Sequence, residues 1–224
     1  MTQTGLDTAR LRMQGCLTSV ILPAGFMAGL KTVEDCMKDP ILRTFLGHAL
    51  LHEIMPGMGL GRETLEPMAM EVCGEMERPK VMQPLSLLLP NSVRAFAKDA
   101  LPLLLSYQDR EDQCPPCLCM ALSTLIMLFA GARRDEDGKY WIPMGEKDQC
   151  ALSEDEEILF SFSRLSCDMP PESLAYAVLS DRAIWDRDLR ETPGLEDMIA
   201  NQLRDLQLLG LNMSLAKAYG RHEG

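Results

Sequence analysis

The chain has 224 residues and a mass of 25.0 kDa, enough to bury a core as one large domain or two small ones. Hydrophobic residues make up 46% and charged residues 25%, a balance that excludes an intrinsically disordered chain. The net charge of −11 opposes binding to nucleic acid and to anionic membrane surfaces, so neither is expected as a partner.

The composition indicates the fold class, and the cysteine content indicates the cellular compartment. Aromatic residues are scarce at 5%, while Met occurs 16 times, which suits helix-on-helix packing because flexible thioethers fill irregular gaps. Eight Cys, several on apolar helical faces, and a polar start without a secretory leader are typical of a reduced, cytoplasmic protein. The longest apolar run, residues 118–132, is too short to span a bilayer. We expect a single all-α, multi-helix domain over residues 1–224, with at most a small hairpin near residues 133–147.

In the first half of the chain, apolar residues at spacings of three and four predict amphipathic helices. Residues 6–30 read as a short polar helix followed by an apolar stretch that Pro23 breaks. Thr32 is expected to cap the next helix, Val33–Lys38. Further helices are predicted over Ile41–Met55 and Glu63–Met76.

His48 and His52 lie one helical turn apart and Glu53 follows, a spacing that can ligate a metal. A helix breaker, Pro56, comes shortly afterwards, and no second motif supplies further ligands. A solvated helix face is therefore favoured, and no metal site is predicted.

The apolar run Leu85–Leu89 leads through a polar turn at residues 90–92 into a helix that begins near Val93. Free N–H groups and the positive end of a helix dipole meet at such a turn, where a binding site can form. A plain helix start is the alternative, and periodicity alone favours it.

A short cysteine cluster, Cys114, Cys117 and Cys119, resembles half of a zinc or redox motif. A structural zinc site needs a second pair at suitable spacing, and no thioredoxin-like strand precedes the cluster. The two prolines after Cys114 more simply begin the buried helix Cys117–Phe129. Zinc and redox chemistry are therefore disfavoured.

The rest of the chain is predicted to form a polar segment at residues 133–147, followed by short helices. A strand-like run covers residues 139–143. Ser153 and Glu156 have the spacing of a capping box for the next helix. Helices are then expected over Pro171–Leu179 and from Leu195 to about Tyr219.

Four stretches resemble the C-terminal helical domain of the polyol-specific long-chain dehydrogenases, the mannitol dehydrogenase family. Within that family they are most similar to the tagaturonate reductase (altronate oxidoreductase) branch, and their order and spacing cover nearly the whole chain. The stretches are AGLKTVEDCMKDP at Ala28–Pro40, HEIMP at His52–Pro56, PNSVRAFAKDALPLLLSY at Pro90–Tyr107 and IWDRDLRETPGLEDMIANQLRDLQLLG at Ile184–Gly210.

The resemblance implies an N-terminal Rossmann domain that holds NAD, this helical domain, and a substrate lying between the two. It implies metal-independent hydride transfer between nicotinamide and a keto sugar acid or polyol. A Lys would act as general acid/base, while an Asn and a His would position the carbonyl oxygen. The sequence has no strand–G-x-G-x-x-G–helix unit, so the Rossmann domain is expected to be absent and the chain alone to bind no NAD.

The family's Lys-x4-Asn-Gly-x-His-Thr motif is altered in this sequence. One pairing, which matches Gly15 and Thr18 to the Gly and Thr of the motif, places these residues at the Lys, Asn and His positions: Ala9, Gln14 and Leu17. A pairing shifted by one residue places others there: Arg10, Gly15 and Thr18. Neither pairing supplies the Lys or the His, and an Arg cannot replace the Lys because its guanidinium stays protonated. No catalytic residue is therefore intact.

On the substrate side, Asn91, Ser92 and Phe96 fit the family's Asn-Ser-x-x-Lys-Phe pattern, whereas Ala95 replaces its Lys. Arg94 could offer a guanidinium to a sugar carboxylate. The substrate-binding residues that the resemblance implies are Arg12, Gln14, Thr18, Asn91, Ser92 and Arg94.

The leading hypothesis is the substrate-side domain of a tagaturonate-reductase-like oxidoreductase, truncated or degenerate and inactive alone, so its own status as an enzyme stays open. One alternative is a subunit of a split dehydrogenase that works with a separately encoded NAD-binding chain. Another is an all-α interaction protein that keeps the fold without the chemistry. In either case we expect an exposed apolar docking face, which a partner or a second copy of the chain would cover.

Overall fold

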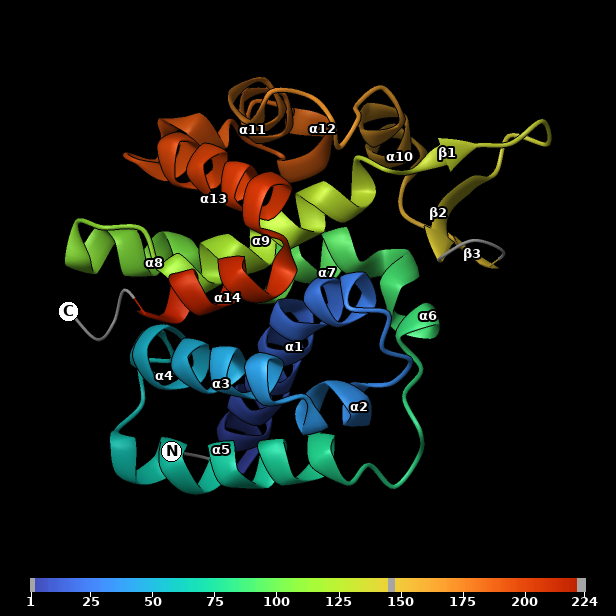
Figure 1. Cartoon of the computed structure of the whole chain (residues 1–224). Coiled ribbons are helices and arrows are strands. Elements are labelled where there is room, and N and C mark those ends of the chain that lie inside the picture. The colour runs from blue at the N-terminus through green and yellow to red at the C-terminus, as the bar shows by residue number, and fades with distance from the viewer. Residues whose placement is uncertain (1–2, 145–147, 221–224) are drawn as a thin grey trace.

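A computed structural model describes residues 3–144 and 148–220 of the chain. Figure 1 shows a body of helices with a small sheet at one edge. The prediction of an all-α domain with little sheet is confirmed. None of the helices in the described ranges is long and apolar enough to cross a membrane.

The elements of the first half surround the long helix α1. In chain order they are α1 (Gln3–Met27), α2 (Val33–Lys38), α3 (Pro40–His48), the π-helix η1 (Ala49–Ile54), α4 (Met55–Gly57), α5 (Arg62–Glu77), α6 (Leu85–Leu88), the 3-10 helix η2 (Leu89–Asn91), α7 (Ser92–Asp99) and α8 (Leu101–Glu111).

The second half begins with the buried helix α9 and ends with two helices that lie across it. In chain order its elements are α9 (Pro116–Phe129), β1 (Arg133–Arg134), β2 (Tyr140–Met144), β3 (Asp148–Ala151), α10 (Glu156–Ser163), α11 (Pro171–Leu179), α12 (Arg182–Trp185), the 3-10 helix η3 (Leu189–Glu191), α13 (Leu195–Leu209) and α14 (Leu211–Tyr219).

Helix α1 packs against α7, α9 and several shorter helices, and so lies at the centre of the first half. The prediction that Pro23 breaks this region is wrong, because α1 is one helix of 25 residues with Pro23 inside it. Proline costs the helix one backbone hydrogen bond. Its neighbours Val20, Ile21 and Ala24 are fully buried, and this tertiary packing outweighs the local loss.

The predicted helix starts near residue 32 are confirmed. Thr32 and Asp35 form a reciprocal capping box, with each side chain accepting the other's backbone N–H at 3.1 Å. Asp39 caps α3 by accepting from the N–H groups of Ile41 and Leu42, both at 3.0 Å. The predicted helix Ile41–Met55 is continuous but changes to π-helical geometry in η1.

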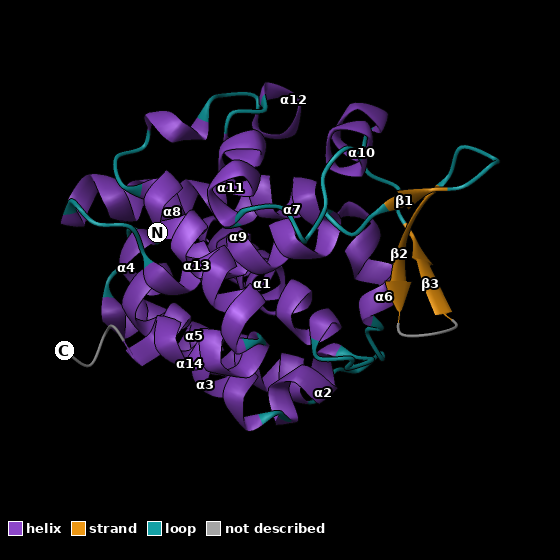
Figure 2. Ribbon diagram, turned by 45° about the horizontal axis from the view of Figure 1, so that its top comes forward, coloured by secondary structure: helices purple, strands orange, loops and turns teal. Residues whose placement is uncertain are grey.

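Three short antiparallel strands form the sheet, in the order β1–β2–β3. Figure 2 shows them at one side of the helical body. Trp141 of β2 pairs with Arg133 on one side and with Ala151 on the other. The sequence predicted only a hairpin; the third strand is added because the cross-strand pair Ile142 and Cys150 is buried against the core. Residues 145–147 of the predicted hairpin lie outside the described ranges.

The prediction of a single final helix from Leu195 to Tyr219 is wrong, because Gly210 separates two helices, α13 and α14. Gly210 has φ 75° and ψ 174°, a conformation that is essentially restricted to glycine. The periodicity of apolar residues continues across this position, so it could not reveal the break.

Replacing Gly210 with Ala is expected to lower the free energy of unfolding by roughly 1–3 kcal/mol. An added Cβ would meet no atom within 4 Å, so the cost is one of backbone conformation alone. Gly47 is a matched control because it also has open space around it but lies inside α3. Gly47→Ala should instead stabilise the protein by roughly 0.5–1 kcal/mol. Urea unfolding of the two variants checks the opposite signs, and equal signs would contradict the prediction.

Candidate functional site

The predicted residues of α1 lie on different sides of this helix. Gln14 and Thr18 are half-buried and lie one turn apart, so they share a face. Arg12 is exposed, and its charge acts on Asp99 of α7. Leu17, which one of the two pairings places at the His position, is fully buried in the core. That position therefore faces away from any ligand on the surface.

Helices α1 and α7 are in close contact at Gly15. A Cβ built on Gly15 would lie only 2.5 Å from Oδ2 of Asp99. Burial raises the pKa of Asp99, and the charges of Lys98 and Arg12 partly oppose this. The glycine of the altered motif thus has a packing role, because a side chain there would displace a half-buried carboxyl group.

A groove of about 440 Å³ lies between α1, the second half of α5 and residues 78–83. Gln14 is the predicted residue that reaches it, and the other polar groups lining it include Arg78, Lys80 and Gln83. Glu71 and Glu75 also line the groove, and Arg10 forms ion pairs with both of them, at 3.5 and 2.5 Å. We call this cavity the Gln14 groove.

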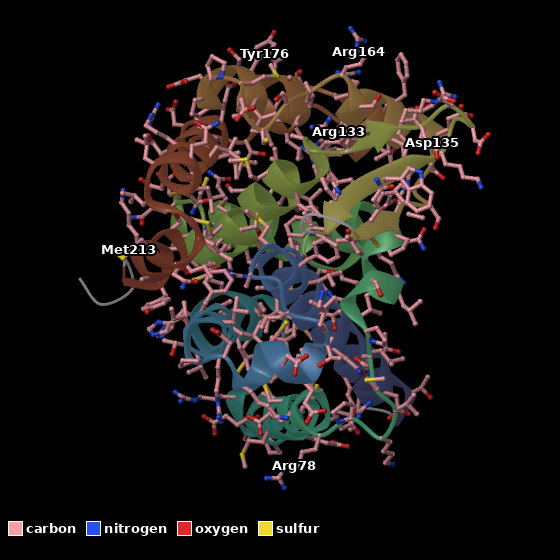
Figure 3. The ribbon with its side chains drawn as sticks, turned by 45° about the vertical axis from the view of Figure 1, so that its right-hand side comes forward. Arg78, Arg133, Asp135, Arg164, Tyr176 and Met213 are labelled. Atoms are coloured by element: carbon pink, nitrogen blue, oxygen red, sulfur yellow. The ribbon has the colours of Figure 1, made fainter. Side chains whose placement is uncertain are left out.

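Two cationic side chains of the Gln14 groove, Arg78 and Lys80, differ from Arg10 in having no carboxylate partner within residues 3–144 and 148–220. Arg78 and Lys80 are exposed and form no ion pair with another described residue. Figure 3 shows Arg78 pointing outward at one end of the molecule. A cation without a carboxylate partner beside amide side chains is suited to a small anion that also carries hydroxyl groups.

Apolar side chains surround the Gln14 groove and remain in contact with solvent. Met70 and Val81 line it and are 77% and 76% exposed. Met82 follows Val81 and is 67% exposed, while Leu11, one turn before Gln14 on α1, is 63% exposed. Several large apolar groups exposed close together are typical of a surface that another protein surface covers.

The predicted residues at the start of α7 form a separate cluster. Asn91 is exposed and Ser92 is buried. The guanidinium of Arg94 binds Asp155, with Nε 2.9 Å from Oδ2, and lies 3.8 Å from a carboxylate oxygen of Asp186. Within the described residues, Arg94 is thus held by two acidic side chains and makes no contact with Gln14 or Thr18 that would form one site.

Glu154 is a buried acidic residue that the sequence did not reveal. The predicted cap of α10 by Ser153 is wrong, because α10 begins at Glu156 and receives no side-chain cap bond. Oε1 of Glu154 instead accepts from the N–H groups of Val93 and Arg94, at 2.5 and 3.3 Å. Burial raises the pKa of Glu154 to about 7, against the opposing effect of these two hydrogen bonds.

Two buried polar atoms at this junction have no hydrogen-bond partner in the part of the chain that the structure describes. Oε2 of Glu154 and Oγ of Ser92 are both buried and unpaired there. Ser92 is only 2% exposed, so it contributes to the junction between α7 and the segment before α10. It does not line the Gln14 groove.

The His48–His52–Glu53 segment is only partly a solvated face. His52 is exposed, but His48 is half-buried and its ring stacks on Tyr219 with centroids 5.1 Å apart. Glu53 is fully buried, and its two oxygens accept from the N–H groups of Cys117 and Leu118, both at 2.7 Å. Across residues 3–144 and 148–220, no group of three or more His, Cys, Asp or Glu side chains is arranged to hold a metal ion.

No family model matches the chain. Altronate oxidoreductase of Klebsiella pneumoniae (strain 342) is 30% identical over 190 residues, which cover 83% of this chain and 37% of that protein. The enzyme of Shigella sonnei (strain Ss046) is 31% identical over the same shares.

Two solved structures have the same helical fold. Mannitol 2-dehydrogenase of Pseudomonas fluorescens, solved as a ternary complex with NAD and D-mannitol, matches 96% of this chain with a TM-score of 0.75 and 10% identity. A D-sorbitol dehydrogenase solved in substrate-free form matches with a TM-score of 0.71 and 13% identity. This chain covers 41% of each of those proteins.

The fold is therefore that of the C-terminal domain of polyol dehydrogenases. The resemblance to the mannitol dehydrogenase family is confirmed: this chain is homologous to the C-terminal portion of altronate oxidoreductase. It spans well under half the length of these relatives.

Proposed function

We propose that the chain forms the substrate-side wall of an oxidoreductase acting on a sugar acid or its keto form, with NAD held by a domain outside this chain. The observation that carries the proposal is the homology to altronate oxidoreductase over 83% of the chain. The same region of the P. fluorescens enzyme belongs to a protein solved with NAD and a polyol.

The residues present do not fit NAD. A dinucleotide lies across the carboxyl edge of a parallel sheet, with its pyrophosphate at a glycine-rich turn that opens a helix. The sheet of the described residues has three short antiparallel strands. A hydride donor would therefore have to be held by another domain.

The proton-transferring group is also missing from α1. Either Ala9 or Arg10 stands where the family motif has its Lys, and either Leu17 or Thr18 stands at the His position. Arg10 is protonated at neutral pH and is paired with Glu71 and Glu75. These residues support a chain that binds a substrate but does not by itself transfer a proton.

The Gln14 groove is the part of the surface best suited to a sugar acid. Its amide groups, Gln14 and Gln83, can donate to and accept from hydroxyl groups, and Arg78 and Lys80 supply positive charge for a carboxylate. The exposed apolar residues around it support coverage by the NAD-binding domain, which would also exclude water from the bound substrate.

We expect the isolated chain to bind altronate and not NADH. Arg78→Ala should weaken altronate binding by a factor of at least about 10, because a charge-assisted hydrogen bond contributes about 1.5–3 kcal/mol and about 1.4 kcal/mol corresponds to a factor of 10. Arg164→Ala is the matched control, since Figure 3 places Arg164 at the opposite end of the molecule. Isothermal titration calorimetry measures both ligands, and amide chemical shifts locate the altronate contact.

Two outcomes would contradict this proposal in different ways. Micromolar NADH binding to the isolated chain would show that the dinucleotide site lies within it. Altronate that leaves the amide signals of Gln14 and Gln83 unchanged would remove the groove assignment while leaving the homology intact. Size-exclusion chromatography of the chain alone distinguishes a second copy from a different partner as the molecule covering the apolar residues.

A further inference from the structure

The start of α9 brings two cysteines together that are not the pair of the C-P-P-C motif. Pro115 is the N-cap residue and Pro116 the first residue of the helix, so Cys114 directly precedes the cap and Cys119 is the fourth helical residue. Side chains at these two positions pack against each other in the hydrophobic staple of many helices. Cys114 and Cys119 occupy these two positions, so their side chains face each other at the start of α9.

The two sulfurs differ in access. Cys114 lines a cavity of about 380 Å³ between the α8–α9 connection and the start of α13, together with Tyr107, Pro193 and Gly194. Its thiol also donates a hydrogen bond to the carbonyl of Pro193 at 3.5 Å. Cys119 is fully buried behind it. A small reagent that enters this cavity therefore meets Cys114 first.

The pKa shifts of the two thiols also indicate that Cys114 reacts before Cys119. A side-chain hydrogen bond with Cys119 lowers the pKa of Cys114, and burial raises the pKa of Cys119. A thiol with a lowered pKa is the better nucleophile because the thiolate is the reactive form. Cys117 has no such role: it is fully buried, and burial raises the pKa of its thiol.

We propose that Cys114 is a peroxide-reactive thiol and that Cys119 completes its oxidation to a Cys114–Cys119 disulfide. In the first step the Cys114 thiolate attacks one oxygen of hydrogen peroxide, the S–O bond forms, the O–O bond breaks, and hydroxide leaves and takes up a proton as water. Cys114 is then a sulfenic acid.

In the second step the sulfur of Cys119 attacks the sulfur of the Cys114 sulfenic acid. The S–S bond forms, the S–O bond breaks, and the departing hydroxide takes the Cys119 proton and leaves as water. Two thiols and one peroxide thus give one disulfide and two waters. The disulfide carries no S–H, so the hydrogen bond from Cys114 to the Pro193 carbonyl is lost.

The test treats the native full chain with dilute hydrogen peroxide and maps disulfides by mass spectrometry after digestion. We expect two of the eight thiols to be lost together and a Cys114–Cys119 cross-link to appear before any other. Because this measurement uses the unmodified chain, it does not depend on a variant that folds.

Variants separate the two steps. Cys119→Ser should leave Cys114 trapped as a sulfenic acid that dimedone labels, whereas Cys114→Ser should give neither the label nor the cross-link. Cys167→Ser is the control, because Cys167 is also partly accessible but lies in the α10–α11 connection, and it should leave the cross-link unchanged. First oxidation at Cys73 or Cys167, or a cross-link that pairs Cys117, would overturn the proposal.

Discussion

Replacing Glu53 with Ala is expected to lower the free energy of unfolding by roughly 3–5 kcal/mol, the range for a buried polar contact that loses one partner. The side chain is fully buried and accepts two short hydrogen bonds from the first turn of α9. Pro115 and Pro116 leave that turn without a side-chain cap of its own. In the variant, the N–H groups of Cys117 and Leu118 are therefore left buried without the acceptor that Glu53 provides.

Glu53→Gln should recover only part of this loss. The two N–H groups bind different oxygens of Glu53, and an amide offers one oxygen and one NH2 group. One backbone donor would then face another donor. We expect the Gln variant to lose roughly half as much stability as the Ala variant.

Glu111→Ala is the control for both variants, because Glu111 is an exposed residue at the end of α8 and should change stability by at most about 0.5 kcal/mol. Urea unfolding followed by far-UV circular dichroism measures all three. A Glu53→Ala variant as stable as Glu111→Ala would show that water replaces the carboxyl group at the start of α9.

The caps of these helices explain how far the sequence predicts the fold. Thr32 and Asp39 bind N–H groups two or three residues away, so their spacing predicts them. Glu53 and Glu154 bind N–H groups more than 60 residues away, and no local pattern encodes such a partner. Local rules thus assigned Glu53 to a solvated face and placed Glu154 within a capping box that does not form.

For the candidate site, too, the sequence predicts the positions that local motifs encode but not those that only tertiary packing brings together. The family motifs located the relevant positions on α1 and α7, because homologous stretches keep their order along the chain. They did not locate the Gln14 groove, since Arg78 and Lys80 follow α5 and meet α1 only through tertiary packing. The motifs also grouped Arg94 with Gln14, whereas acidic residues of the second half hold Arg94 elsewhere.

Glu154 should make the protein less stable as the pH rises. Burial raises its pKa from an ordinary value of 4.5 to about 7 in the folded chain. Between these values the folded state binds more protons at this group than the unfolded state does, so the free energy of unfolding falls with increasing pH. Discounted for solvent screening, the loss is roughly 2 kcal/mol and is complete above the folded-state pKa.

Glu154→Gln is expected to remove this pH dependence while keeping the contact. Oε1 accepts both backbone hydrogen bonds and Oε2 has no described partner, so an amide fits with its oxygen in the Oε1 position. The variant should match the wild type at about pH 4, below the unfolded-state pKa, and exceed its stability by roughly 2 kcal/mol at about pH 8.

Two comparisons make the assignment of this effect to Glu154 specific. Glu154→Ala removes the acceptor as well as the charge, so it should lose stability at both pH values. Glu157→Gln changes an exposed neighbour and should follow the wild type at both. Guanidinium unfolding at each pH measures the differences. A Gln variant that tracks the wild type across the whole range would mean that the carboxyl group of Glu154 is charged in the folded chain without cost, which would contradict its burial beneath α7.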